Sequence, residues 1–275
     1  MMNDKVPNVN SLRRLVSIRS WLAKVGRLSL VLFYHAGGIA YLTKDAWSVL
    51  FSTRIRWKAT MDQMFKMGVT SLPLVGMTAL FTGMVLALQS AYQLRLFAAE
   101  QFTSDLIALS ITRELGPVLT AMVVAGRVGA SIAAELGTMK VTEQVDALKA
   151  LAVDPTRYLV VPRVVAGVLM LFVLTIYADC IGMFGGYLIA VFKLSISSHQ
   201  YIKRTIQALM IKDLMTGLIK AFFFGAIISV VGCYFGFKAT DGAEGVGKAT
   251  TFAVVTALIL IIASDAVFTA IFYFF

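Results

Sequence analysis

Four charged side chains interrupt an apolar stretch between residues 106 and 137: Arg113, Glu114, Arg127 and Glu135. A lone arginine near mid-bilayer costs roughly 2.5–3.5 kcal/mol on insertion scales, so Arg127 is expected to be paired or to face water. Ser131 and Glu135 follow Arg127 at one and two helical turns, and Arg113 precedes it by close to four turns. The spacing predicts one shared helix face, which is either a structural ion pair at the helix end or a polar wall beside a substrate path.

Other groups that could do chemistry are few. Asp179 and Asp265 lie in apolar stretches and could form an intramembrane aspartyl pair, but membrane carboxylates more often serve transport or packing. The two histidines lie in separate regions, and the two cysteines match no metal or redox spacing. We therefore expect no catalytic residue, no metal and no resident cofactor.

Residues 242–249, GAEGVGKA, nearly match the phosphate-binding pattern G-x-x-x-x-G-K-[ST], but Ala249 stands at the Ser/Thr position. A working phosphate loop also needs a preceding strand and a following helix inside a soluble α/β domain. Apolar stretches flank this segment instead. We interpret it as a flexible glycine-rich connection and expect no nucleotide to bind there.

Five apolar stretches supply the elements that hold these residues. Residues 67–94 form a run of 28 without a charge, and about 20 apolar residues suffice to cross a hydrocarbon core of about 30 Å. The interrupted stretch counts as a span because its centre, Leu115 to Gly126, is apolar. The sequence predicts an all-α membrane protein with transmembrane helices at about residues 67–94, 106–137, 161–192, 213–237 and 249–275.

Composition supports this class. Of the 275 residues, 59% are hydrophobic and 15% are charged, whereas soluble domains carry about a quarter charged residues. Residues 1–66 hold 11 basic and three acidic residues. A basic segment attached to an apolar body is typical of contact with a membrane surface. No nucleic-acid binding is expected, because that function needs a soluble basic face.

Lysine and arginine counts predict the orientation. Residues 1–66, 138–163 and 238–248 hold 11, four and two of them, whereas residues 95–105 and 193–212 hold one and four. Because cytoplasmic segments carry the excess of positive residues, the N-terminus is expected to be cytoplasmic and the C-terminus periplasmic. The segment 193–212 is an exception, because its four positive residues are expected to face outward.

The N-terminal region, residues 1–66, is predicted to be basic and amphipathic, with one or two interfacial helices within residues 11–62. Its apolar run, residues 28–42, has 15 residues and is interrupted by Gly37-Gly38. That is short for a span, although a sixth span here is the alternative.

Two further features surround the second span. Small residues recur every four positions in two parallel series, Ala125, Gly129, Ala133, Gly137 and Gly126, Ala130, Ala134. They predict close helix packing, either within one subunit or between subunits. After the span, a short amphipathic helix is predicted at about residues 141–152, ended by Asp154-Pro155. It either rests on lipid headgroups or is held by a cytosolic partner.

The run from Arg113 to Pro155, RELGPVLTAMVVAGRVGASIAAELGTMKVTEQVDALKALAVDP, resembles the signature of the MlaE/YrbE permeases. These are membrane subunits of ABC lipid transporters that work with MCE proteins, and chloroplasts have a related permease. The resemblance continues in residues 213–236 and 242–255, so it covers about residues 68–275. Within it, the structural motif residues are Gly116, Pro117, Gly126, Arg127, Gly129, Glu135 and Gly137.

The resemblance implies a homodimer in the bacterial inner membrane, a cytosolic ABC ATPase dimer, a periplasmic MCE-domain protein, and membrane lipids as substrate. It implies that residues 67–275 form a five-span permease domain preceded by an interfacial helix. It also implies that the short helix after the second span couples to the ATPase through Thr142, Glu143, Gln144, Asp146 and Leu148.

The function predicted from the sequence is a lipid permease, with phospholipids as the expected cargo. Gln89, Arg113 and Glu114 fall at the outer ends of the first two spans and are the lipid-path candidates for meeting a headgroup; alternatively, Arg113 and Glu114 form a solvated ion pair. The rival function is an ion-coupled secondary transporter of hydrophobic substrates, with Glu114, Asp179 or Asp265 as a proton relay. Five spans without a visible repeat argue against it.

Overall fold

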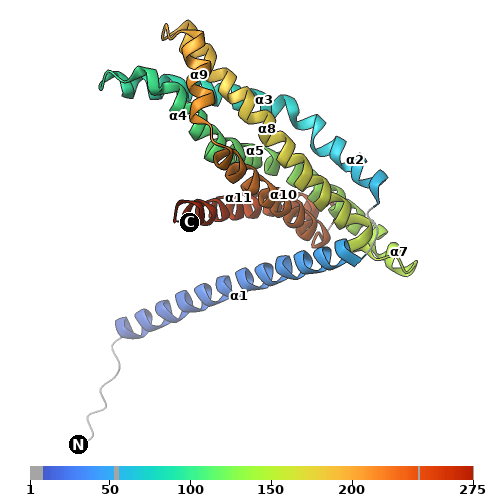
Figure 1. Cartoon of the computed structure of the whole chain (residues 1–275). Coiled ribbons are helices and arrows are strands. Elements are labelled where there is room, and N and C mark those ends of the chain that lie inside the picture. The colour runs from blue at the N-terminus through green and yellow to red at the C-terminus, as the bar shows by residue number, and fades with distance from the viewer. Residues whose placement is uncertain (1–8, 53–55, 241, 275) are drawn as a thin grey trace, which may run out of the picture. The chain divides into compact units, whose positions relative to one another are not determined.

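The computed structural model describes residues 9–52, 56–240 and 242–274. Within these ranges the chain forms helices and turns and no strand. Five of the described helical segments are long and apolar enough to cross a membrane: Trp57–Arg95, Glu100–Val141, Thr156–Phe192, Ile211–Phe237 and Gly242–Phe272 (Figure 1). The predicted all-α, five-span class is therefore confirmed.

The N-terminal region contains one long helix and one short helix. Helix α1 spans Val9–Ser52, and α2 spans Trp57–Met67. The chain divides into two compact units, Met1–Lys44 and Asp45–Phe275. Helix α1 is not among the helices apolar enough to span a membrane, so a sixth span gains no support from the described residues. Helix α2 leads through η1 (Val69–Ser71) into α3 (Leu72–Arg95), so the helical segment that contains the first span begins at Trp57.

Helix α8 (Val161–Phe192) is central to the second unit, where it packs along α3 and α10 (Ile211–Phe237) (Figure 1). Glycines allow the backbones to touch. A Cβ atom on Gly83 of α3 would lie 1.9 Å from the carbonyl oxygen of Gly182, and one on Gly225 of α10 would lie 2.6 Å from that of Gly167. Both partners are on α8, so small residues set the spacing on each of its two sides, as is usual in membrane bundles.

Helix α11 (Gly242–Phe274) packs against α10 and α6 (Ala130–Val141) on one side only. Its buried stripe consists mainly of alanines spaced one turn apart: Ala249, Ala253, Ala257 and Ile261. Its exposed large side chains are apolar, and include Phe252, Val255, Ile259, Ile262 and Val267. Of the most apolar 18-residue stretch of this helix, only 11% is buried, so a single chain leaves most of this helix uncovered.

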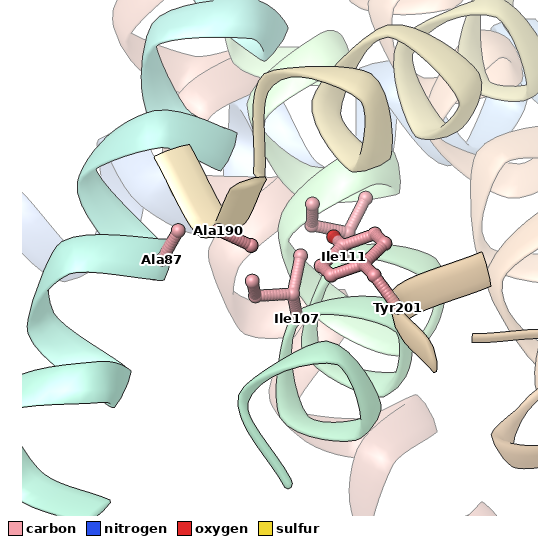
Figure 2. Close-up of a cluster of buried hydrophobic side chains, with 5 residues drawn as sticks. All are labelled: Ala87, Ile107, Ile111, Ala190 and Tyr201. Atoms are coloured by element: carbon pink, nitrogen blue, oxygen red, sulfur yellow. The ribbon is translucent and has the colours of Figure 1, made fainter. Parts of the chain in front are cut away.

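Two short helices, α4 (Thr103–Ser110) and α9 (Ser198–Ala208), close the end of the bundle where the second span begins. Their packing residues form one apolar cluster with α3 and α8, drawn in Figure 2: Ala87, Ile107, Ile111, Ala190 and Tyr201. Arg204 of α9 pairs with Asp105 of α4 at 3.1 Å. Burial raises the pKa of Tyr201 to about 12. This packing fixes the segment that carries Arg113 and Glu114.

Candidate functional site

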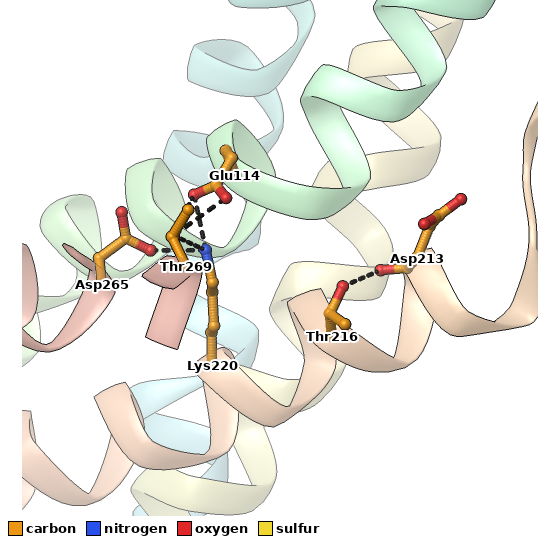
Figure 3. A network of polar contacts seen from close by, with 6 residues as sticks. All are labelled: Glu114, Asp213, Thr216, Lys220, Asp265 and Thr269. Carbon is orange, nitrogen blue, oxygen red and sulfur yellow. Dashed lines mark hydrogen bonds and ion pairs between the residues drawn. The ribbon is translucent and has the colours of Figure 1, made fainter. Parts of the chain in front are cut away.

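A buried lysine gathers side chains from three helical segments at this end of the bundle. The Nζ atom of Lys220 on α10 lies 2.6 Å from Oε2 of Glu114, 2.7 Å from Oγ1 of Thr269 and 2.9 Å from Oδ1 of Asp265. Glu114 belongs to the π-helical turn η3 (Ile111–Leu115), and Asp265 and Thr269 belong to α11. Figure 3 shows their oxygens converging on the single nitrogen. We call these four residues the Lys220 cluster.

The chemistry of an ammonium group accounts for this geometry. Lysine has N–H donors and no acceptor, and Nζ donates hydrogen bonds to Glu114 and Thr269. Asp265 pairs with Nζ through charge, without a hydrogen bond to its Oδ1 atom. The Lys220 side chain is 1% exposed, whereas that of Glu114 is 41% exposed. A buried charge is costly unless it is paired and hydrogen-bonded. The cluster therefore holds a charged lysine within the helix bundle and presents Glu114 at the accessible surface.

A second ion pair lines a pocket beside the cluster. Nη2 of Arg113 lies 2.6 Å from Oδ1 of Asp213, and Nε of Arg113 donates to the same oxygen at 2.8 Å. Asp213 is buried, but Arg113 and Lys212 are exposed. With Thr216 and Phe272 they line a pocket of about 170 Å³ that also includes Glu114 and Lys220. Two exposed cations thus face a space bordered by carboxylates.

A wide helical turn brings Arg113 and Glu114 to this pocket. The turn η3 is followed directly by Gly116 and Pro117. Pro117 has no N–H to donate to the preceding turn, and the N–H of Gly116 donates to the carbonyl oxygen of Ile111, five residues earlier. Gly116 also needs its small size, because a Cβ atom there would lie 1.8 Å from Oδ1 of Asp179. Gly116 and Pro117 therefore shape the turn that positions the two charged residues.

The lipid-path candidates are only partly brought together. Arg113 and Glu114 line one pocket, but Arg113 pairs with Asp213 and Glu114 with Lys220, so the alternative of an ion pair between Arg113 and Glu114 is wrong. Gln89 is exposed on α3 and does not line this pocket. The partners lie 100 and 106 residues away in sequence. The spacing of residues along the chain could not have predicted these pairs. Asp213 and Lys220 could still have been selected as candidates, because they are charged residues near the start of an apolar helix.

Arg127 and Glu135 both have partners, but not each other. Nη1 of Arg127 donates to Oγ of Ser71 at 2.7 Å. Glu135 pairs with Arg163 at 3.0 Å and with Lys66 at 3.4 Å. The structural ion pair at this end of the second span therefore exists for Glu135 but does not include Arg127. The partners Ser71 and Lys66 both belong to the segment that leads into α3, so Arg127 and Glu135 reach the same neighbouring segment.

The two series of small residues have different surroundings. A Cβ atom on Gly129 would lie 3.5 Å from Ile228 of α10, and one on Gly137 would lie 3.2 Å from Ala239. A Cβ atom on Gly126 would meet nothing within 4 Å, and Gly126 is exposed. Packing within the chain therefore accounts for Gly129 and Gly137 and leaves Gly126 open.

The short helix after the second span is α7 (Gln144–Ala150), inside the expected range 141–152. Thr142, Glu143 and Gln144 are exposed, and Leu148 is half-buried. Glu143 adopts a φ of +60°, a left-handed conformation that turns the chain sharply from α6 into α7. Leu151, just after the helix, is 74% exposed. Charged, polar and apolar groups thus share one accessible surface at the end of the bundle opposite the Lys220 cluster.

Asp146 of α7 is already held by cations of its own chain. Its carboxylate lies 2.7 Å from Nζ of Lys140 and 3.1 Å from Nζ of Lys149. Hydrogen bonds from these two lysines lower the pKa of Asp146 below its ordinary value. Glu143 makes no ion pair among the described residues, so it is the acidic group of this surface that is available to a cationic partner.

The glycine-rich segment of residues 242–249 is helical. It forms the first turns of α11, so the flexible connection expected from its composition is wrong. A Cβ atom on Gly245 would collide with the carbonyl group of Thr240, which shows that these turns pack tightly. Within the described residues, no group of three or more His, Cys, Asp and Glu side chains could hold a metal ion.

Five helices that are long and apolar enough to cross a membrane, with charged groups buried among them, indicate a multi-pass membrane protein. The family model for Permease MlaE matches residues 60–271. The chain belongs to the MlaE permease family, as its resemblance in the second span and the following helix indicates.

Relatives extend this assignment along the chain. A probable ABC transporter permease protein of Rickettsia typhi is 45% identical over 90% of this chain and 96% of its own length. The intermembrane phospholipid transport system permease protein MlaE of Haemophilus influenzae is 35% identical over 93% of this chain and 98% of its own. The chloroplastic protein TRIGALACTOSYLDIACYLGLYCEROL 1 of Arabidopsis thaliana is 39% identical over 80% of this chain and 63% of its own.

Proposed function

We propose that this chain is the permease subunit of an ABC transporter that moves phospholipids between a bacterial inner membrane and a periplasmic MCE protein. In this proposal the chain binds neither nucleotide nor cofactor, and a separate cytosolic ATPase dimer hydrolyses ATP. The names of the Haemophilus and Rickettsia relatives support the cargo and the ABC class.

The charged pocket beside the Lys220 cluster is the observation that carries the cargo assignment. A phospholipid joins a charged headgroup to apolar chains, so its path needs both kinds of surface side by side. On the other flank of η3, Ile111, Leu115 and Leu119 line a small, mostly apolar cavity of about 20 Å³ with residues of α3 and α8. This cavity is too small for an acyl chain, but it places apolar side chains about one helical turn from the charged pocket.

The polar groups suit recognition of a headgroup. Asp213 holds the guanidinium of Arg113 in place, and guanidinium groups match the planar, bidentate geometry of phosphate oxygens. Lys212 adds a second exposed cation to the lining. Glu114 is accessible in the same pocket and can accept hydrogen bonds from a headgroup amine. A zwitterionic headgroup would therefore find complementary charges for both of its ends.

We assign contact with the ATPase to the α7 surface, through Thr142, Glu143, Gln144, Asp146 and Leu148. Helix α7 lies in the chain between α6 and η5 (Thr156–Val160), which leads into α8. A force applied to α7 would thus be transmitted to two helices that pack against α10, the helix of Lys220. This connection gives ATP hydrolysis a physical route to the lipid pocket.

The proposed orientation has a cytoplasmic N-terminus and a periplasmic C-terminus, which puts α7 in the cytoplasm and the Lys220 cluster near the MCE protein. We further propose that the subunit works as a homodimer. The open position at Gly126, where small size allows another helix to approach closely, supports a second copy as its neighbour.

The test is ATP-dependent transfer of a fluorescent phospholipid from proteoliposomes that contain permease, ATPase and MCE protein. Lys212→Gln removes an exposed cation of the pocket, so transfer should fall about fivefold for a loss of about 1 kcal/mol, with complex assembly unchanged. Arg95→Gln is the matched control, because Arg95 is exposed at the same end and pairs with Glu100 outside the pocket.

Two results would refute the proposal. Equal transfer by Lys212→Gln and the unaltered protein would remove the headgroup role of the pocket. Transport by the permease alone on a pH gradient, without nucleotide, would favour the ion-coupled carrier. Arg113→Glu is a less clean probe, because the buried Asp213 would then face a like charge and the bundle itself would be destabilised.

A further inference from the structure

A second polar pocket lies at the end of the second unit that bears α7. It encloses about 550 Å³ between the start of α2 and the residues that join η5 to α8. Three of its lining residues are cationic, Arg56, Lys58 and Arg163, and one is acidic, Asp62. Helix α8 begins here and α10 begins at the other end with Lys212, so this pocket is separate from the Lys220 cluster.

Arg163 is a buried cation with unused hydrogen-bonding capacity. Its side chain is 5% exposed. Nη1 donates to the carbonyl oxygen of Leu159 at 2.8 Å, and Nη2 pairs with Glu135 at 3.0 Å. Nε is buried and has no hydrogen-bond partner among the described residues. A buried donor on a charged group is expensive to leave unsatisfied. Arg163 lines the pocket, so an anion there would lie beside its guanidinium and be attracted by its charge.

The beginning of α2 adds positive potential to the same space. Arg56 is its N-cap residue, no side chain caps the helix, and its first turn holds no acidic residue. Helix N-termini carry a partial positive charge and bind phosphate through their free N–H groups. The guanidinium of Arg56 lies 4.0 Å from the centre of the Tyr158 ring, a cation–π contact that holds it at the pocket wall.

Two aromatic residues favour a lipid as the source of the anion. Trp57 and Tyr158 line the pocket and are 61% and 39% exposed. Tryptophan and tyrosine concentrate at the depth of lipid headgroups, and Trp57 begins the helical segment that contains the first apolar span. A zwitterionic headgroup would bring its own cation toward Arg56 and Lys58, so the lining favours a headgroup with net negative charge.

We propose that this pocket binds the phosphate headgroup of an anionic phospholipid, such as phosphatidylglycerol, in the leaflet on the α7 side. The bound phosphate would bridge the start of α2 and the start of α8 and offset the repulsion among the three cations that line the pocket. The lipid is a resident ligand and not the transported molecule. Because its test measures binding at a separate pocket, it stands or falls independently of the transport function.

The experiment uses the full-length chain in nonionic detergent, with phosphatidylglycerol or phosphatidylcholine added and bound lipid counted by native mass spectrometry. The unaltered protein should retain phosphatidylglycerol preferentially. Lys58→Gln and Arg56→Gln should each weaken it about fivefold, at about 1 kcal/mol per cation near a membrane surface. Lys58→Arg should bind normally. Lys248→Gln is the matched control, because Lys248 is exposed on α11 outside the pocket and pairs with Glu244.

Arg163 is left unaltered, because its pair with Glu135 supports the bundle. Three outcomes would overturn the proposal: equal binding of the two lipids, undiminished phosphatidylglycerol binding by folded Lys58→Gln, or an equal loss in Lys248→Gln. Adding inorganic phosphate as a competitor distinguishes a lipid headgroup from a soluble phosphate compound as the bound anion. No displacement supports a lipid, whereas displacement at millimolar phosphate would assign the pocket to a soluble phosphate compound and refute the lipid.

Discussion

Replacement of Lys220 by methionine removes the cation at the centre of the Lys220 cluster while keeping a side chain of similar length. Its ammonium joins Glu114, Thr269 and Asp265 at 2.6, 2.7 and 2.9 Å. Removing one partner of a buried ion pair costs about 3–5 kcal/mol, because the other charge stays buried. Glu114 is 41% exposed and can be hydrated in part, so we expect about 3 kcal/mol, at the lower end of that range.

Thermal unfolding of the purified chain in detergent measures this loss. At about 2–4 °C per kcal/mol for a chain of this size, Lys220→Met should lower the Tm by about 6–12 °C. Lys212→Met is the matched control, because Lys212 is exposed near the same end of α10, and it should change the Tm by less than about 2 °C. Asp265→Asn in the Lys220→Met background should restore part of the loss, because one unpaired carboxylate disappears. An unchanged Tm for Lys220→Met, or strictly additive effects of the two substitutions, would refute the reasoning.

Three further predictions concern other parts of the molecule. Glu143→Lys should sharply reduce co-purification with the partner ATPase, whereas Glu100→Lys, a charge reversal at the opposite end, should not; equal retention of the ATPase would argue against α7 as the contact. Gly83→Ala should destabilise the bundle by about 1–3 kcal/mol in thermal unfolding, because its Cβ atom would lie 1.9 Å from the Gly182 carbonyl oxygen, while Gly126→Ala has free space and should not. Burial raises the pKa of Tyr201 to about 12 from about 10 in the unfolded chain. Below pH 10 the phenol is protonated in both states, and as pH rises toward 12 the unfolded state ionises first, so the protein should lose about 2–3 kcal/mol that Tyr201→Phe retains; parallel Tm-against-pH curves would contradict this.

The five spans could be predicted because their signal is local. A run of about 20 apolar residues is sufficient to identify a membrane helix, and residues 67–94 and 249–275 satisfy that criterion without tertiary information. Helix ends were harder to place, since the helical segment that contains the first span begins at Trp57, where charged residues still alternate with apolar ones. The helical fold of residues 242–249 was missed because glycine composition predicts flexibility, whereas these residues form the first turns of α11.

The charged site could be predicted only in part, because two π-helical turns alter the register of the second span. Regular spacing predicts that Arg113, Arg127 and Glu135 share a face. The turns Ile111–Leu115 and Ala125–Gly129 bond five residues back instead of four. Each such turn takes in about one extra residue, which rotates the following side chains by about 100° relative to the regular pattern. The directions of these side chains depend on backbone geometry that composition does not encode, and so do the α10 partners of Arg113 and Glu114.

The one-sided packing of α11 bears on how the protein is made. Helices α6 and α10 precede α11 in the chain, so the surface that receives its alanine stripe is already synthesised when α11 enters the membrane. Its other flank then meets lipid tails, which are as apolar as its exposed side chains, and no hydrophobic force drives it to aggregate. A newly inserted subunit could therefore persist singly in the bilayer, and the pairing proposed above would be a step separate from membrane insertion.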